Sequence, residues 1–253
     1  MLTLAQSPLF LQKQTRGFFF WIVACLVGSA MPDAYGQNDG MVFSPEVVAG
    51  QTSLDFRTAY NPDEATWVYR NHIQYGFSDS FNLRAATQHR IDSSGKWDFR
   101  FFRAQALWQF LEDEKAGWDS ALRFEFQIGE GDDAPSGVRV AWTGAYDIDE
   151  NWQIRGNFLT GYRTFPDSDP GALLEVRGQI SRRLNRTFRL SLDYFGNMND
   201  TKTFGNWDSQ NHQTGPTLRV RFNESVTITV GALFGISRAA SSKEFRIVTG
   251  FFF

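Results

Sequence analysis

The chain has 253 residues, a formal net charge of −3 at pH 7 and a mean hydropathy of −0.35. This polar average argues against a helical membrane protein but not against a barrel, whose strands expose only alternate residues to lipid, and the small charge indicates no nucleic-acid partner. The single cysteine, Cys25, lies near the N-terminus, so the rest of the chain can hold neither a disulfide framework nor a thiol nucleophile.

Residues 1–36 have the pattern of a secretory signal peptide. Two cations precede an apolar run over residues 17–27, and small residues follow, with a small-x-small cleavage site that ends at Gly36. The run is too short for a transmembrane helix, which needs about 20 apolar residues. An alternative is a lipoprotein processing box ending at Cys25, in which case that residue would be lipidated.

Residues 37–50 form a short lead-in, which we expect to be irregular, and residues 51–253 alternate apolar and polar side chains in segments of about ten residues. One face of each segment is rich in aromatic and aliphatic residues, and the other carries charged and polar ones. We predict twelve strands: 51–60, 66–77, 81–91, 97–111, 118–129, 138–148, 152–163, 173–184, 188–198, 217–223, 226–237 and 244–253.

One predicted strand, 97–111, changes phase. It begins with Trp97, Phe99 and Phe101 on the apolar face and continues with Phe102 and Ala104 on that face. A single extra residue in one strand of an antiparallel pair produces such a change. The sequence therefore predicts a β-bulge near Phe101-Phe102.

The connections between these strands alternate between tight and long. Bacterial outer-membrane barrels have short periplasmic turns, longer outer loops and an even number of strands. We therefore predict a closed antiparallel up-and-down transmembrane β-barrel of twelve strands, with the first strand running outward and both ends of the mature chain on the periplasmic side. The longest loop is 200–216.

The chain ends in the alternating segment Glu244-Phe-Arg-Ile-Val-Thr-Gly-Phe-Phe-Phe253. An exposed apolar edge strand invites pairing with other chains, whereas a strand that closes a membrane barrel has no free edge. An aromatic last residue after alternating apolar residues resembles the signal by which Gram-negative outer-membrane barrels are recognised. That resemblance implies an outer-membrane location, contact with outer-membrane lipid and recognition of Phe253 by the barrel-assembly machinery.

A soluble sandwich or lipocalin-like barrel would also show alternation. Here, however, the apolar faces are heavy in Phe, Trp and Tyr at the strand ends, and the opposite faces carry large charges. A soluble secreted β-protein remains the alternative fold.

The inward face is dominated by arginine. The chain has twenty arginines and five lysines, and no lysine is predicted to face inward. The candidates for contact with a solute are Arg57, Arg70, Arg84, Arg100, Arg103, Arg123, Arg139, Arg155, Arg177, Arg189, Arg219, Arg221 and Arg246, and Arg90 and Arg163 share their face. The predicted lumen carboxylates are Asp55, Asp98, Asp119, Glu125, Glu175 and Asp193, together with Asp147 and Glu244.

Two interpretations of this face are open. Arginine forks can satisfy neighbouring carboxylates in a tied structural network. The surplus of seven cations, fifteen minus eight, can instead attract anions into a narrow bore. Loop 200–216 provides candidates for a lid or constriction in Phe204, Trp207 and His212, the alternative being an ordinary solvated loop. No cofactor is indicated, and three scattered histidines predict no metal site.

An enzyme would need a nucleophile that the pattern lacks. Outer-membrane phospholipases are also twelve-stranded and carry an outward-facing Asn, His and Ser. Asn71, Thr87 and His89 are predicted to face lipid here, with Asn71 opposite Thr87 in a hairpin centred on Asp79. The serine expected two residues after the histidine is Ile91, so the set is incomplete and we predict no enzymatic activity.

Three stretches of the last quarter are similar to outer-membrane barrels of the phenol-degradation MetA-pathway, or "transporter", type: Leu190-Ser-Leu-Asp-Tyr-Phe-Gly196, His212-Gln-Thr-Gly-Pro216 and Val230-Gly-Ala-Leu-Phe-Gly-Ile-Ser237. Near the start, Leu54-Asp-Phe-Arg57 through Tyr69-Arg70 and Tyr75-Gly-Phe-Ser78 resembles the opening of the oligogalacturonate channels. Those are twelve-stranded and have arginine-lined bores, which implies an acidic solute here. The first resemblance assigns no substrate.

We therefore expect a passive channel for small anionic solutes. A closed barrel with a structural or partner-binding role is the alternative, and a lipid hydrolase is a third. The sequence indicates neither the solute nor the oligomeric state.

Overall fold

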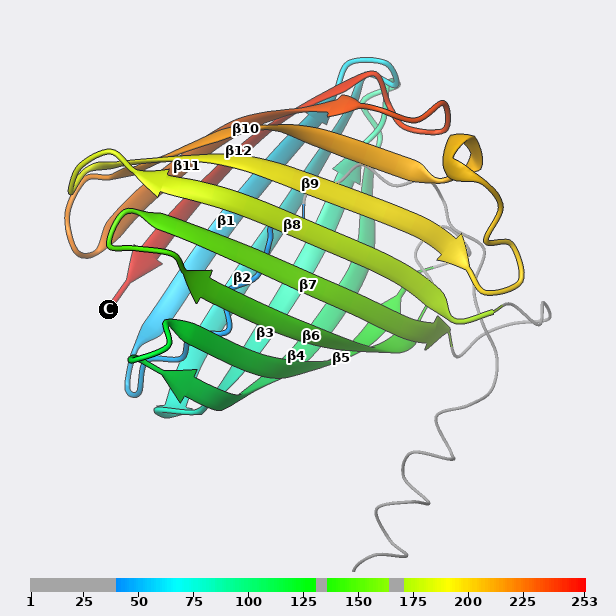
Figure 1. Cartoon of the computed structure of the whole chain (residues 1–253). Helices are drawn as coiled ribbons and strands as arrows, with labels where there is room; N and C mark the ends of the chain where they lie inside the picture. The colour runs from blue at the N-terminus through cyan, green and yellow to red at the C-terminus, as the bar shows by residue number, and fades with distance from the viewer. Residues whose placement is uncertain (1–39, 131–135, 164–170) are drawn as a thin grey trace, which may run out of the picture.

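A computed structural model describes residues 40–130, 136–163 and 171–253. Twelve antiparallel strands form one closed barrel in which each strand pairs with its sequence neighbours and β1 pairs with β12 (Figure 1), so the predicted fold class is confirmed. The strands are β1 (Thr52–Asn61), β2 (Thr66–Ser78), β3 (Phe81–Ile91), β4 (Trp97–Asp113), β5 (Trp118–Gly129), β6 (Gly137–Asp147), β7 (Trp152–Arg163), β8 (Leu173–Arg183), β9 (Phe188–Asp200), β10 (Asn211–Arg221), β11 (Val226–Gly235) and β12 (Lys243–Phe252).

The predicted signal peptide, the first residues of the lead-in and Cys25 lie outside the described residues. Within them, the one helical element is the 3-10 turn η1 (Trp207–Ser209), and no helix has the length and apolar character to cross a membrane.

Alternating side chains separate an apolar exterior from a polar interior. In β12, Phe245 and Ile247 point outward and are 48% and 52% exposed, whereas Glu244 and Arg246 point inward and are 0% and 7% exposed. Large apolar side chains are exposed in this way on every strand except β10, whose Leu218 and Val220 are half-buried. An apolar outer surface over a polar interior is typical of a barrel that crosses a membrane.

The two ends of the barrel differ. The turn end carries the tight connections 79–80, 114–117, 148–151, 184–187 and 222–225, and the loop end carries the others. At the turn end Thr52 and Phe253 exchange two backbone hydrogen bonds of 3.1 and 2.9 Å. The terminal phenylalanine thus takes part in closing the barrel.

The bulge in β4 lies one residue before the predicted position. Gln88 of β3 pairs with Phe101 and His89 pairs with Phe99, which leaves Arg100 as the extra residue. Phe101 consequently faces the lumen, and its predicted outward orientation is wrong. Its ring takes guanidinium groups at 5.2 Å (Arg70) and 4.4 Å (Arg103) from its centroid, so cation–π contacts favour the inward position.

The tenth strand is longer than predicted, because residues 211–216 belong to β10 and not to a loop. Pro216 lacks the N–H that a central strand uses, which is why the sequence predicted a break there. β10 stays paired with β9 through this residue, opposite Leu192, whereas its pairing with β11 is interrupted at residues 215–216. The proline is tolerated because one side of the strand gives up its hydrogen bonds locally.

Residues 40–50, which we call the strap, run inside the barrel from its loop-end half to the turn end. Arg246 donates to the Gly40 carbonyl, Asn157 bonds to Phe43, and Gly50 donates to the Gly76 carbonyl at the turn end. The strap is irregular, as expected. The described part of the lead-in lies inside the lumen and reaches the turn end at Gly50, and the predicted position of the mature N-terminus falls outside the described residues.

Candidate functional site

The lumen is lined by the predicted arginines. Eight of them are buried: Arg57, Arg70, Arg100, Arg103, Arg123, Arg163, Arg177 and Arg246. The other seven occupy the inward face of their strands by register, namely Arg84, Arg90, Arg139, Arg155, Arg189, Arg219 and Arg221. The structure thus brings the predicted set together, while contact with a solute stays a prediction.

Within the part of the chain that the structure describes, lumen arginines form ion pairs with predicted carboxylates. The pairs are Arg57–Asp55 (3.2 Å), Arg100–Asp98 (3.0 Å), Arg103–Glu125 (3.5 Å), Arg177–Glu175 (2.6 Å) and Arg246–Asp193 (2.9 Å). Three of these join residues two apart on one strand, whose side chains share a face. This part of the lumen follows the paired-network interpretation.

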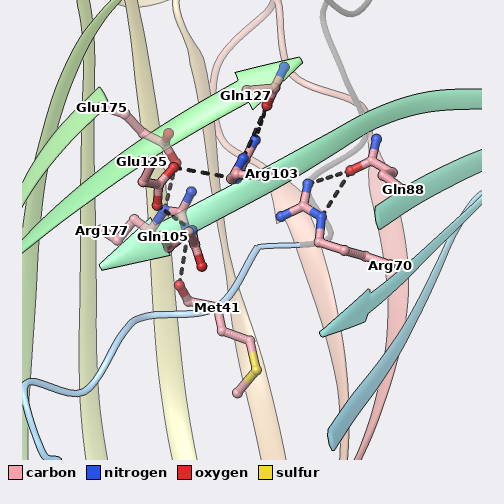
Figure 2. Close-up of polar contacts among 9 residues, drawn as sticks. All are labelled: Met41, Arg70, Gln88, Arg103, Gln105, Glu125, Gln127, Glu175 and Arg177. Atoms are coloured by element: carbon pink, nitrogen blue, oxygen red, sulfur yellow. Dashed lines mark hydrogen bonds and ion pairs between the residues drawn. The ribbon is translucent and has the colours of Figure 1, made fainter. Parts of the chain in front are cut away.

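A second group of arginines binds glutamine. Arg70 binds Gln88, Arg84 binds Gln74 and Arg103 binds Gln127, and in each case the two residues are direct cross-strand neighbours. Figure 2 shows two of these pairs, with the guanidinium groups held by amide oxygens.

The glutamine amide oxygen accepts hydrogen bonds from the guanidinium and carries no net charge, so these contacts orient the cation but contribute nothing to neutralising it. Glu125 pairs with Arg103 and also accepts a hydrogen bond of 2.6 Å from Gln105. The sequence analysis missed the role of the glutamines. Inward-facing Gln opposite inward-facing Arg in a hairpin register is the signal that would have found it.

Several lumen arginines have no carboxylate partner among the described residues. They are Arg84, Arg123, Arg139, Arg155, Arg189 and Arg219. Because the bore excludes much of the solvent that would screen them, their charge makes the interior attractive to anions.

The turn end carries a row of like charges. Arg189 of β9 lies directly opposite both Arg183 of β8 and Arg219 of β10. Like charges directly opposite one another destabilise a sheet. The row places three cationic side chains side by side on β8–β10 at the turn end.

Three arginines of the central lumen bind the strap. The guanidinium carbon of Arg123 lies 3.4 Å from the Phe43 ring centroid. Arg177 donates to the Met41 carbonyl and Arg246 donates to the Gly40 carbonyl, each at 2.8 Å (Figure 2 shows the first contact). The sequence analysis missed this as well, although the apolar run Met41-Val-Phe43 is unusual for a solvated lead-in.

The strap fits its surroundings closely. Val42 packs with Phe195 and Leu233, and Val47 packs with Leu107 and Ala121. Between the strap and the wall of β8–β12, a cavity of 20 Å³ remains, which is room for about one water molecule. On this side of the bore, the strap leaves little free space against the wall.

The lid candidates lie elsewhere. The His212 side chain points outward, its Nδ1 2.8 Å from the Tyr194 hydroxyl, and its ring stacks on Trp207 at 3.7 Å. The Trp207 indole nitrogen donates to the Ile236 carbonyl, and Phe204 is 45% exposed. Trp207 and His212 fasten the loop to the outside of the barrel and do not constrict the lumen, because His212 belongs to β10, in which even-numbered positions face out.

The outward polar residues pair as predicted, with Asn71 opposite Thr87 and Tyr69 opposite His89. The His89 ring lies 4.8 Å from Trp97 and 5.2 Å from Phe99, which makes it part of the aromatic rim at the loop end. Among the described residues, no cluster of His, Cys, Asp and Glu has the arrangement of a metal site.

No family model and no curated protein matches the sequence. Solved structures share the fold. A KdgM porin aligns with a TM-score of 0.59 at 10% identity, covering 79% of this chain and 98% of that chain. A NanC porin aligns with a TM-score of 0.59 at 10% identity over 78% and 98%. A KdgM porin in complex with disordered oligogalacturonate gives 0.57 at 10% identity. The similarity to the MetA-pathway type stays a prediction.

Proposed function

We propose that this protein is an outer-membrane channel for the passive uptake of small anionic solutes. The turn end, with its short connections, faces the periplasm in this proposal, and the longer loops face outward. The observation that carries the proposal is the state of the lumen arginines. Six of them have no carboxylate partner among the described residues, so the interior keeps a cationic surplus: Arg84, Arg123, Arg139, Arg155, Arg189 and Arg219.

The structural neighbours support an acidic solute. They are porins with the same barrel, and one was solved with oligogalacturonate, whose sugars carry carboxylates. At 10% identity the likeness carries the fold, so the solute class rests on the arginines of this chain. Carboxylates suit them because the guanidinium fork accepts a carboxylate in a bidentate geometry.

A closed barrel with a structural role is the second candidate, and the strap is the observation that favours it. A segment that lies across the bore would prevent passage if it never left. The two candidates differ in whether the strap is fixed or displaceable.

Catalysis is not part of the proposal. The serine expected two residues after His89 is Ile91, and the histidine packs among aromatic rings. For assembly, we propose that the machinery of the outer membrane recognises the strand that ends at Phe253.

Solute flux into liposomes tests the proposal. The mature barrel should let D-glucuronate enter faster than D-glucose, a neutral sugar of similar size. The triple variant Arg155→Gln, Arg189→Gln, Arg219→Gln should lose much of that preference while keeping the glucose flux. Equal entry of both sugars into the unmodified barrel, or faster entry of glucose, would contradict an anion channel.

A further inference from the structure

We propose that the strap is a displaceable closure of the channel, and that carboxylate-bearing solutes open it by replacing its backbone on Arg177 and Arg246. The inference rests on the proposed function and adds its regulation: one set of arginines binds either the protein's own chain or the solute.

The strap contacts most of the barrel wall. It reaches β12 through Arg246, β8 through Arg177, β7 through Asn157 and β4 through Gln109, and its apolar side chains touch β5, β9 and β11. A segment held on so many sides lies across the bore rather than along one wall. Passage of a solute therefore requires it to move.

The arginine contacts are divided between the wall and the strap. Arg177 donates a hydrogen bond of 2.6 Å from Nε to Glu175 and another from Nη1 to the Met41 carbonyl. Arg246 donates a hydrogen bond of 2.9 Å from Nη2 to Asp193 and another from Nη1 to the Gly40 carbonyl. One side of each guanidinium is thus fixed by a wall carboxylate, and the other side is presented to the lumen. Only the lumen side would have to exchange its partner.

A carboxylate is the better partner for that side. Both acceptors form charge-assisted hydrogen bonds with a guanidinium, but a carboxylate adds the attraction between opposite charges and can accept two parallel N–H bonds, whereas the strap offers neutral carbonyl oxygens. An anionic solute at sufficient concentration would replace them without disturbing Glu175 or Asp193. A neutral sugar offers no such gain.

Apart from the two arginines, two polar side chains of the wall bind the backbone of the strap. Asn157 accepts from the Phe43 amide at 2.7 Å and donates to the Phe43 carbonyl at 3.2 Å, and Gln109 accepts from the Val47 amide at 3.0 Å. None of its residues belongs to a strand. Segments without ladder hydrogen bonds belong to the low-stability part of a protein, from which moving elements are drawn.

Gly76 anchors the strap at the turn end. Its amide donates to Gln51, its carbonyl accepts from Gly50, and an added Cβ would lie 2.0 Å from the Val48 carbonyl oxygen. Alanine at this position would push the strap off the wall while leaving every arginine in place. At Gly178 an added Cβ meets only Tyr194, at 4.0 Å, so Gly178→Ala is a matched control.

The first experiment measures exposure of the strap. Val42 is 4% exposed, and a cysteine placed there would be the only one in the chain after residue 36. In the Val42→Cys barrel, D-glucuronate should raise the rate of labelling by a charged maleimide several-fold, and D-glucose should not. Adding Arg177→Gln and Arg246→Gln should remove the effect of glucuronate. Equal labelling with and without glucuronate would overturn the proposal.

The second experiment measures conductance and does not depend on a cysteine. Gly76→Ala should conduct several-fold more than the unmodified barrel, and Gly178→Ala should match it. If Gly76→Ala conducts no more than Gly178→Ala while both prefer anions, the strap is not the closure, although the proposed channel stands. If Gly76→Ala conducts strongly but prefers cations, the proposed function fails instead.

Discussion

Arg246 on β12 bonds to Asp193 on β9 at 2.9 Å, across the two strands that lie between them in the barrel. Asp193 also accepts from Gln179 at 2.8 Å and from Thr217 at 2.9 Å. Through these bonds Asp193 links β8, β9 and β10 to Arg246, and the Nη1 of that arginine donates to the Gly40 carbonyl of the strap. The same guanidinium therefore binds both the barrel wall and the strap.

Asp193→Asn should destabilise the barrel. Removing one partner of a buried ion pair costs about 3–5 kcal/mol, because the other charge stays buried without compensation. Unfolding of the detergent-solubilised barrel in urea measures the change. Asp98→Asn is the control: its pair with Arg100 is partly exposed, with the carboxylate side chain at 40%, and it should cost at most about 1 kcal/mol. Equal effects of the two substitutions would contradict the role given to Asp193.

Asn157→Ala should loosen the strap, because it removes both hydrogen bonds to Phe43. Each is worth about 0.5–1.5 kcal/mol. Single-channel recordings should show more frequent or larger openings than in the unmodified barrel. Asn71→Ala, on the outward face, should leave the recordings unchanged. A decrease in conductance in Asn157→Ala would count against a closing strap.

Substitutions of the glutamines that bind arginine should show whether ion selectivity depends on the charge of the lumen or on its hydrogen bonds. Gln88→Glu with Gln127→Glu keeps an acceptor and adds two negative charges, so it should reduce the preference for anions. Gln88→Ala with Gln127→Ala removes the acceptors and leaves the charge, so the preference should persist. Ion selectivity measured for both double variants decides the point. The idea fails if the alanine variant loses selectivity as much as the glutamate variant.

Trp207→Ala should release the loop 201–210 without changing transport. The indole stacks on His212 and bonds to the Ile236 carbonyl on the outside of the barrel, so its loss exposes the loop to proteases. Limited proteolysis should cut this loop faster in the variant, and solute flux should match that of the unmodified protein. A changed flux would contradict this placement and indicate that Trp207 acts as a lid.

One contact between loops should depend on pH. Hydrogen bonds from the Ser242 hydroxyl and amide, each 2.7 Å, lower the pKa of Asp63 below its usual value of 3.8. A depressed pKa means that the contact contributes above pH 3.8 and is lost as the pH falls through the folded value. Proteolysis of loop 236–242 by an acid protease should accelerate in that range. Asp63→Asn should abolish the pH dependence, and a pH dependence that survives would contradict this origin.

Alternation made the barrel predictable. Successive side chains of a strand point to opposite faces, so the alternation of apolar and polar residues predicts both the number of strands and the inward arginines. The bulge was misplaced because Phe101 is apolar and its preference for two guanidinium groups is a tertiary effect. The start of β10 was missed for a related reason, since the interrupted pairing with β11 that accommodates Pro216 cannot be read locally.

The partners of the arginines were harder to predict. Charge counting finds the surplus, but it cannot tell that Arg84 binds Gln74 or that Arg123 stacks on Phe43. The strap lies outside the alternating pattern, and its position depends on contacts with strands more than a hundred residues away, such as Asn157. Such long-range contacts leave no local signal.

The reversal potential of the purified mature barrel in a planar bilayer, under a gradient of KCl, tests the central claim most directly. A lumen with surplus arginines should give the unmodified protein a reversal potential with the sign of an anion-selective channel. Gly76→Ala should give the same sign with a larger current. A cation-selective potential, or no conductance in either protein, would contradict it.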